Sequence, residues 1–182
     1  AGLNVPEAIA KKFSSQYHTF LTKRFDRTAK GERIHFASAM TLLGYTDGQD
    51  NKDGASYLDL AEFIISNGKN ASTNLEELWR RIVFNVCISN TADHLRNHGF
   101  ILTSKGWVLS PAYDMNPVET GTGLNLNISD NDNALDLGLA MEVHEYFRLE
   151  KNKANKILMK VKSAVSNWRK IAKKYQISKA EQ

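Results

Sequence analysis

Two side chains in the middle of the chain have the chemistry of a magnesium site. Asn97 closes a polar stretch that begins at Asn90, and Asp114 follows after two short apolar runs. Mg²⁺ takes oxygen ligands and usually combines one or two carboxylates with substrate phosphates and water. An Asn followed by a later Asp is also how sites of phosphoryl transfer hold the metal that neutralises the phosphates. The pair therefore points to phosphoryl transfer.

The residue at position 92 does not fit that chemistry. Protein kinases place an Asp beside the attacking hydroxyl, five residues before the metal-binding Asn, in the pattern D-x-x-x-x-N. Here that position is Ala92, whose methyl group cannot accept a proton. Asp93 is adjacent but lies only four residues before Asn97, so we expect its side chain to leave the loop in another direction. The loop thus combines a metal-binding pattern with a missing base.

A zinc site is the alternative for the same stretch. His94 and His98 stand four residues apart with Asp93 beside them, a spacing that suits zinc when a helix brings both rings to one face. The polar neighbours and Gly99 argue against a helix here. We therefore favour phosphoryl transfer over a metal hydrolase and assign no function to His98.

A long amphipathic helix is predicted directly before the loop, with caps offered between Asn70 and Asn74. Glu76, Glu77, Arg80 and Arg81 are expected to face outward. The predicted buried stripe, with apolar residues three and four apart, consists of Leu75, Leu78, Trp79, Ile82, Val83, Val86 and Cys87. Such a helix would present the loop from a rigid element.

A hairpin is predicted directly after the loop. Gly99 to Thr103 and Trp107 to Ser110 are short apolar runs, joined by the turn residues Ser104-Lys105-Gly106. The second run leads through Pro111, Ala112 and Tyr113 to Asp114.

Cap, turn and periodicity signals predict the remaining elements. At the N-terminus we expect a helix from Asn4 to about Ser14 and a strand from Tyr17 to Asp26. Further along we expect a segment from Phe36 to Leu43 closed by Gly44, a helix from Ser56 to Asn67 closed by Gly68, a possible short strand at Leu124 to Ile128, a helix from Asn133 to Val143, a turn from His144 to Leu149, and a helix from Glu150 to Tyr175. The count describes an α-rich α+β lobe.

Composition places the chain among ordinary globular proteins. It has 182 residues, 42% hydrophobic and 24% charged, and no apolar run as long as a membrane span. Its one cysteine, Cys87, is expected to be buried and inert, which agrees with a reducing cytoplasm. Residues 151–182 hold ten Lys or Arg and one Glu. We expect this basic face to be solvated and do not expect direct binding of nucleic acid.

Several motifs in order carry a family resemblance. The loop reads Asn90-Thr91-Ala92-Asp93-His94-Leu95-Arg96-Asn97, and it is followed by Ser110-Pro111-Ala112-Tyr113-Asp114, with further matches at Lys23-Arg24-Phe25-Asp26-Arg27, Ser38 to Gly44 and Ser56 to Leu60. Together they cover most of the chain. They resemble the C-terminal lobe of the HipA-like toxin kinases, bacterial serine/threonine kinases of toxin–antitoxin modules that are linked to persistence.

The resemblance implies a protein-kinase-like C-lobe with the end of an N-lobe. Residues 1–34 would be the end of the N-lobe and the approach to the hinge. Residues 35–182 would be the helical C-lobe, with the catalytic loop at 90–97 and the metal-binding Asp114. The segment from Phe36 to Leu43 would be the linker that holds adenine, although a closely packed small-residue helix explains it equally well. The Gly-rich phosphate loop and its partner lysine would lie upstream of Ala1, in a longer protein.

The resemblance also implies the ligands and partners. ATP and Mg²⁺ would be the cofactors, with Asn97 and Asp114 on the metal and His94 and Tyr113 joining them around the nucleotide. A protein with a serine or threonine hydroxyl would be the substrate, a DNA-binding antitoxin a partner, and the cytoplasm the location; no membrane association is expected. The family usually reads Asn-Thr-Asp-Asp-His where this chain has Ala92, so we expect the chain as given to be inactive. A non-catalytic binding module derived from a kinase lobe is the alternative.

Overall fold

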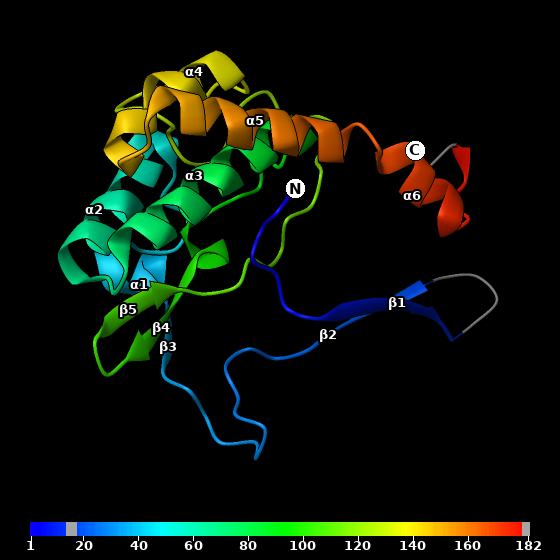
Figure 1. The fold of residues 1–182 in the computed structure, drawn as a ribbon, viewed down its shortest axis with the longest axis horizontal. Helices are drawn as coiled ribbons and strands as arrows, with labels where there is room; N and C mark the ends of the chain where they lie inside the picture. The colour runs from blue at the N-terminus through cyan, green and yellow to red at the C-terminus, as the bar shows by residue number, and fades with distance from the viewer. Residues whose placement is uncertain (14–17, 180–182) are drawn as a thin grey trace.

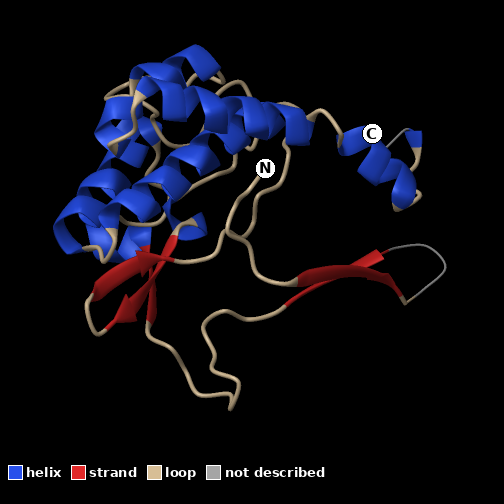
Figure 2. Ribbon diagram, in the orientation of Figure 1, coloured by secondary structure: helices blue, strands red, loops and turns tan. Residues whose placement is uncertain are grey.

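The computed structural model describes residues 1–13 and 18–179. Most of the helices form one body, the last helix projects beyond it, a three-stranded sheet lies against the body, and a separate two-stranded ribbon extends away from body and sheet (Figures 1 and 2). In chain order, the larger elements are β1 (Ala8–Lys12), β2 (His18–Thr22), β3 (Phe36–Ser38), α1 (Ala39–Leu43), α2 (Tyr57–Asn67), α3 (Ala71–Ile88), β4 (Gly99–Thr103), β5 (Gly106–Leu109), α4 (Leu137–Glu142), α5 (Lys151–Val165) and α6 (Trp168–Lys174). Three 3₁₀ turns, η1 (Asn51–Asp53), η2 (Leu95–Asn97) and η3 (His144–Phe147), complete the list.

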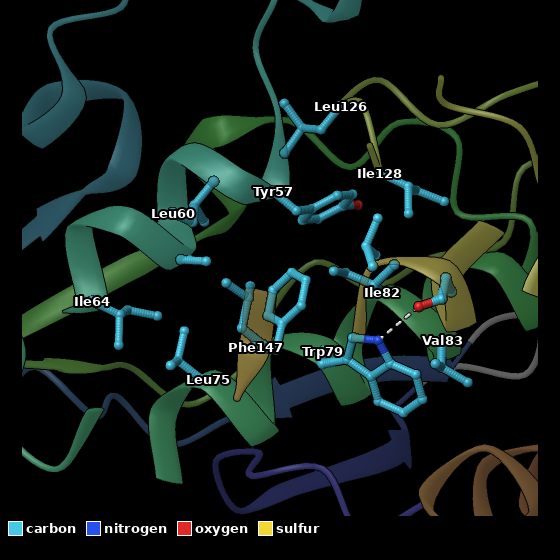
Figure 3. Close-up of a cluster of buried hydrophobic side chains, with 14 of the residues drawn as sticks. Tyr57, Leu60, Ile64, Leu75, Trp79, Ile82, Val83, Leu126, Ile128 and Phe147 are labelled. Carbon is cyan, nitrogen blue, oxygen red and sulfur yellow. Dashed lines mark hydrogen bonds between the residues drawn. The ribbon is translucent and has the colours of Figure 1, made fainter. Parts of the chain in front are cut away.

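Helix α3 is the centre of the body, as its apolar stripe predicts. It packs against α2, α4, η3 and α5, and Leu75, Leu78 and Trp79 are fully buried along it. The indole Nε1 of Trp79 donates to the carbonyl oxygen of Ala140 at 2.9 Å, the dashed contact in Figure 3. The indole ring is thus buried with its N–H group paired. Large buried side chains typically contribute about 3 to 5 kcal/mol each to stability, so this packing fixes the position of α3.

The start of α3 differs from the predicted caps. Asn70 takes a left-handed conformation (φ 55°), and its side chain makes no cap hydrogen bond. Asn74 instead ties the first turn to the hairpin, since its Oδ1 accepts the Leu109 N–H at 2.9 Å and its Nδ2 donates to the Lys69 carbonyl at 2.7 Å. The helix start is therefore locked to the strand that leads toward Asp114.

Helix α2 begins and ends where its signals predict. Ser56 and Asp59 form a reciprocal capping box, and Gly68 follows the last residue. Tyr57, Leu60 and Ile64 face the core together with residues of α3 (Figure 3).

The predicted hairpin is confirmed. Strands β4 and β5 pair with Leu102 opposite Trp107, and β3 adds to the other edge of β4 with Ala37 opposite Phe100. Gly106, at the end of the turn, has a positive φ of 115°, and a Cβ there would lie 2.8 Å from the Asn67 carbonyl oxygen.

The segment from Phe36 to Leu43 is a strand followed by a single helical turn, closed by Gly44 in the left-handed region (φ 76°).

The predicted N-terminal helix is wrong. Ala8–Lys12 is a strand that pairs with His18–Thr22, Ala10 opposite Phe20; the predicted boundaries Ser14 and Tyr17 lie outside the described residues. Asn4, the predicted helix cap, instead binds the helical body and the segment before Asp114 through its backbone. The Asn4 N–H donates to Glu77 Oε1 at 3.0 Å, and the Asn4 carbonyl accepts the Ala112 N–H at 2.7 Å. Pairing across the ribbon and anchoring to the body outweigh the local helix signal.

Two expectations for the segments that follow Asp114 need correction. The alternation at Leu124, Leu126 and Ile128 marks buried side chains, but the segment makes only isolated bridges and no strand. The helix expected from Asn133 begins at Leu137, where Asp136 accepts the Gly138 N–H at 2.7 Å as cap.

The long final helix is broken into α5 and α6. Ser166 Oγ and Asn167 Nδ2 both donate to the Ser163 carbonyl, at 2.8 and 2.7 Å, and such side-chain bonds compete with the helical ladder. Beyond the break the expected apolar face is partly solvated, since Ile171 is 54% exposed. All ten basic side chains between Lys151 and Lys179 are exposed. Within the described residues, no helix combines the length and the apolar character that crossing a membrane requires.

Candidate functional site

Asp93 is the anchor of the loop between α3 and β4. Its Oδ2 accepts hydrogen bonds from Tyr57 Oη at 2.6 Å, Asn85 Nδ2 at 2.7 Å and His98 Nε2 at 2.8 Å. The three donors come from α2, α3 and the residue before β4, and all four residues are at most 2% exposed. A carboxylate buried with three donors is satisfied, so its position is fixed. Burial beside Asp93 raises the pKa of Tyr57 well above its ordinary value, which keeps the phenol a donor.

Neighbouring residues in this loop face opposite ways. Ala92 is exposed while Asp93 is buried, in agreement with the expectation that Asp93 leaves the loop in another direction. Asp93 Oδ2 is committed to three buried donors, and the residue as a whole is 2% exposed. The position that faces outward therefore carries no proton acceptor.

Asn97 lies at the end of the same loop and is 8% exposed. Its backbone N–H donates to the His94 carbonyl at 2.8 Å, and its Nδ2 lies 3.5 Å from the Ala92 carbonyl oxygen. No described residue donates to its Oδ1. The amide oxygen therefore has the freedom that a metal ligand needs.

The strand end that carries Asp114 is held from behind by Arg81. Arg81 Nη2 donates to the Ser110 carbonyl at 2.6 Å, and Arg81 Nε donates to Glu77 Oε1 at 3.1 Å. The prediction that Arg81 faces outward is wrong, because the residue is 1% exposed. Its guanidinium links α3 to the segment after β5. The periodicity of the helix does not predict that a long polar side chain makes this contact.

Asp114 itself is exposed and adopts a left-handed conformation with φ of 56°. Such a backbone is uncommon for an Asp and is often found at functional sites. Asp114 Oδ1 accepts from Asn116 Nδ2 at 2.8 Å, while no described residue donates to Oδ2. Together with the Asn97 amide, this donor set of carboxylate and amide oxygens fits Mg²⁺.

Tyr113 lies between the two candidate ligands. Its hydroxyl donates to the Arg96 carbonyl at 2.7 Å, and its ring stacks on Phe25 with centroids 5.7 Å apart. Burial raises the pKa of Tyr113 to about 12. A cavity of about 650 Å³ adjoins it, and Asp114, Phe84 and Phe20 of the ribbon are among its walls. The cavity has apolar walls with one carboxylate at its rim, a combination typical of ligand sites.

The segment after Asp114 returns to the loop. Val118 N–H donates to the Ser89 carbonyl at 3.0 Å. Gly121 has no room for a side chain, because a Cβ there would collide with Thr91. The residues that follow the candidate metal ligand are thus packed against the residues that precede Ala92.

The two histidines do not form a shared site. His98 is committed to Asp93, whereas His94 Nε2 lies 3.2 Å from Arg96 Nη2. Arg96 in turn pairs with Asp47 in the turn after α1. Among residues 1–13 and 18–179, no group of three or more His, Cys, Asp or Glu side chains could hold a metal ion. Cys87 is half-buried where the sequence predicted a buried residue, and burial raises the pKa of its thiol, which disfavours the reactive thiolate.

Sequence reasoning missed Tyr57, Arg81 and Asn85. One signal was available for the last two, because Arg81 and Asn85 stand four apart beside the apolar positions of α3. Polar residues one turn apart on a buried face need partners and so point to a buried network. Tyr57 carries no comparable local signal.

Comparisons with known proteins agree with this fold. A family model described as the HipA-like C-terminal domain matches residues 1–168. The toxin HipA of Shewanella oneidensis MR-1, solved with HipB and operator DNA, is similar with a TM-score of 0.75 and 20% identity. The proinflammatory kinase CtkA of Helicobacter pylori is similar with a TM-score of 0.54 and 13% identity, over 93% of this chain and 82% of that one. The fold is therefore the α-rich α+β fold of kinase-like proteins.

A sequence relative points the same way. A Haemophilus influenzae protein named as a candidate kinase is 29% identical over an alignment of 123 positions, and the match covers 62% of this chain. The chain spans only 36% of that relative. The structural match with the Shewanella toxin covers 90% of this chain and 44% of the toxin chain.

Proposed function

Because the chain belongs to the HipA-like C-terminal domain family, we propose that it is the lobe of a serine/threonine protein kinase that carries the catalytic loop. Residues 35–182 are the C-lobe, with the loop at 90–97, and residues 1–34 approach it from the N-lobe. The likeness to kinase-like folds and the relative named as a candidate kinase support this proposal.

The roles of the site residues follow from their chemistry. Asn97 and Asp114 hold Mg²⁺ through one amide and one carboxylate oxygen, and the metal supplies neutralisation of the phosphate charges of ATP. Tyr113 and His94 lie beside the nucleotide. Asp93 positions the loop from within through Tyr57, Asn85 and His98, and Arg81 positions the strand end before Asp114.

The observation that carries the proposal is the contrast between positions 92 and 93. The outward position is the one where a kinase needs its base, and it holds Ala92; the carboxylate next to it is buried and engaged. Losing a positioned general base costs about 10²- to 10⁴-fold in rate. The chain with Ala92 therefore keeps the binding groups of a kinase and lacks its proton acceptor.

The test is restoration of the base. Ala92→Asp, made in the full-length protein, should raise phosphoryl transfer to protein by at least about 10²-fold, with little change in ATP affinity. Ala92→Asn is the matched control, because it adds a side chain of the same size that is a poor base. Transfer of labelled phosphate at equal rates by all three forms would show that the base lies elsewhere.

A non-catalytic binding module is the second candidate, and Ala92 is the observation that favours it. Such a module would recognise partners through the same lobe. The Shewanella toxin is solved with HipB and operator DNA, and we propose a DNA-binding antitoxin as a partner of this chain as well. Under this alternative, Ala92→Asp gives no transfer while partner binding is retained.

A further inference from the structure

A groove along the outer side of α2 has apolar walls that are open to solvent. It measures about 400 Å³, and Ala61, Ile65 and Tyr146 are among the residues that line it. Ile65 is 41% exposed, and Tyr146, which belongs to η3, is 60% exposed. Exposed apolar side chains that gather in a hollow with a polar rim often mark a binding site. None of the lining residues belongs to the 90–97 loop or to the candidate metal site, so this α2 groove is separate from the proposed kinase site.

The rim of the α2 groove is negative. Glu62 and Asp130 line it and are exposed, and neither forms an ion pair with a described residue. A third carboxylate, Asp59, is held within the chain, because it accepts from the Ser56 N–H at 2.9 Å and from the Tyr45 hydroxyl at 3.0 Å. Two unpaired carboxylates beside apolar walls fit a segment that combines apolar side chains with positive charges.

Helix α6 carries the complementary combination. Trp168 and Ile171 stand three residues apart, on one side of the helix, and they are 37% and 54% exposed. Lys170 and Lys174 lie next to that side, one helical turn apart. Both lysines are exposed, and neither pairs with an acid in the described part of the chain. Helix α6 therefore presents two apolar side chains edged by two cations.

The two surfaces lie at opposite ends of the molecule. The longest dimension is horizontal in Figure 1, with α2 toward one end and α6 toward the other. Helix α6 is held at its own end by Ala172, which is buried, and by the Tyr175 ring, whose centroid lies 6.2 Å from that of His18 in β2. The α6 of one chain therefore does not reach the α2 groove of the same chain, and a contact between them joins two copies.

We propose that α6 of one copy docks in the α2 groove of a second copy. In this contact Trp168 and Ile171 cover Ile65 and Tyr146, and the two lysines lie beside the two unpaired carboxylates. Tryptophan and tyrosine are among the residues that most often dominate binding energy at interfaces, and rim charges of opposite sign steer the copies together. Helix α6 has seven residues, so the interface is smaller than the roughly 1,200 Å² or more of stable complexes. The association is therefore weak and sensitive to salt.

The first measurement is sedimentation velocity of the 182-residue chain at concentrations from about 10 µM to about 1 mM. The weight-average mass should rise with concentration at about 50 mM salt and much less at about 500 mM salt, because the added ions screen exposed charges. Ile171→Ser should weaken the association about tenfold, since it removes an apolar contact and leaves every charge in place.

Charge reversal on each surface tests the partners of the contact. A groove variant, Glu62→Lys with Asp130→Lys, and a helix variant, Lys170→Glu with Lys174→Glu, should each remain monomeric over the same range. An equimolar mixture of the two should form pairs of one groove variant and one helix variant, because the first keeps an intact α6 and the second keeps an intact groove. Only a contact between these two different surfaces gives this recovery.

The control variant is Lys30→Glu with Lys105→Glu, which makes the same charge change as the helix variant at two exposed lysines outside both surfaces. It should associate as the parent does. A parent that stays monomeric at every concentration, a mixture that stays monomeric, or the same loss of association in the control as in the helix variant would each overturn the proposal. A DNA duplex bound by the monomeric parent and not by the helix variant would assign α6 to nucleic acid instead. None of these measurements involves transfer of phosphate, so their result is independent of the proposed kinase activity.

Discussion

Tyr57 in α2 donates to the Asp93 carboxylate across 2.6 Å and thereby joins the helical body to the loop at residues 90–97. The contact spans 36 residues of sequence. It commits one oxygen of the carboxylate beside Ala92 to a donor in the interior of the body, and Asn85 and His98 donate to the same oxygen.

Removal of that carboxylate should destabilise the fold strongly. Asp93→Ala leaves three buried donors without an acceptor, and we expect a loss of about 3 kcal/mol or more in the free energy of unfolding. Asp114→Asn is the control, because it removes an exposed charge while keeping a residue type that tolerates the left-handed backbone, and it should change stability by no more than about 0.5 kcal/mol. Urea unfolding monitored by circular dichroism gives both values; equal losses would mean that Asp93 does not anchor the loop.

Alkaline pH should weaken the fold through Tyr113. Burial raises its pKa in the folded chain to about 12, whereas an unfolded chain leaves the phenol near its ordinary pKa of about 10. The folded state therefore holds the phenolic proton that the unfolded chain releases, so stability is complete below pH 10 and falls as pH rises from about 10 to 12. Tyr113→Phe should flatten the pH dependence of the urea midpoint in this window. The lost hydrogen bond to Arg96 shifts the midpoint equally at every pH, so an unchanged slope would contradict the assignment.

Binding of Mg²⁺-ATP to the 182-residue chain should be weak. The sequence before Ala92 has no G-x-G phosphate loop, and such a loop with its lysine normally supplies much of the phosphate contact. Calorimetric titration should give no low-micromolar dissociation constant. A tight complex would mean that the cavity beside Tyr113 and Asp114 holds the nucleotide by itself.

The rate of phosphoryl transfer should depend on Asp114 as a ligand of the metal. In a full-length Ala92→Asp protein, Asp114→Asn should lower the rate of phosphoryl transfer by at least about 10²-fold, since metal stabilisation of the transition state is worth several kcal/mol. Asn116→Ala, which removes only the partner of Asp114 Oδ1, should cost far less. A crystal structure with Mg²⁺-nucleotide should place Asp114 within about 2.1 Å of the metal, and a separation above about 4 Å would remove the assignment.

Elements whose signals are local could be predicted from the sequence. The stripe of α3, the capping box at Ser56 and the turn at Gly106 each follow from residues within a few positions of one another. The outward placement of position 92 relative to Asp93 follows from register in the same way. These features locate the loop and the strand that leads to Asp114.

Features that depend on distant partners could not be predicted. Arg81 is buried because the Ser110 carbonyl, 29 residues along the chain, accepts its Nη2, and that partner is not visible in the periodicity of α3. The N-terminal helix signal at Asn4 fails because strands β1 and β2 pair and because Asn4 binds Glu77 and Ala112. The break in the last helix was missed although its cause is local, because Ser166 and Asn167 both donate to the Ser163 carbonyl.

The ribbon has a consequence for how the molecule opens. Every residue of β1 and β2 is exposed, and apart from a ring contact between His18 and Tyr175 the two strands rely on their own ladder. Backbone amides there can exchange with solvent by local opening, at a small fraction of the free energy needed to expose those of α3. The outer edges of both strands are also unpaired, and an unpaired edge is a template for one more strand. The easily opened amides of β1 and β2 therefore lie on edges that can pair with one more strand.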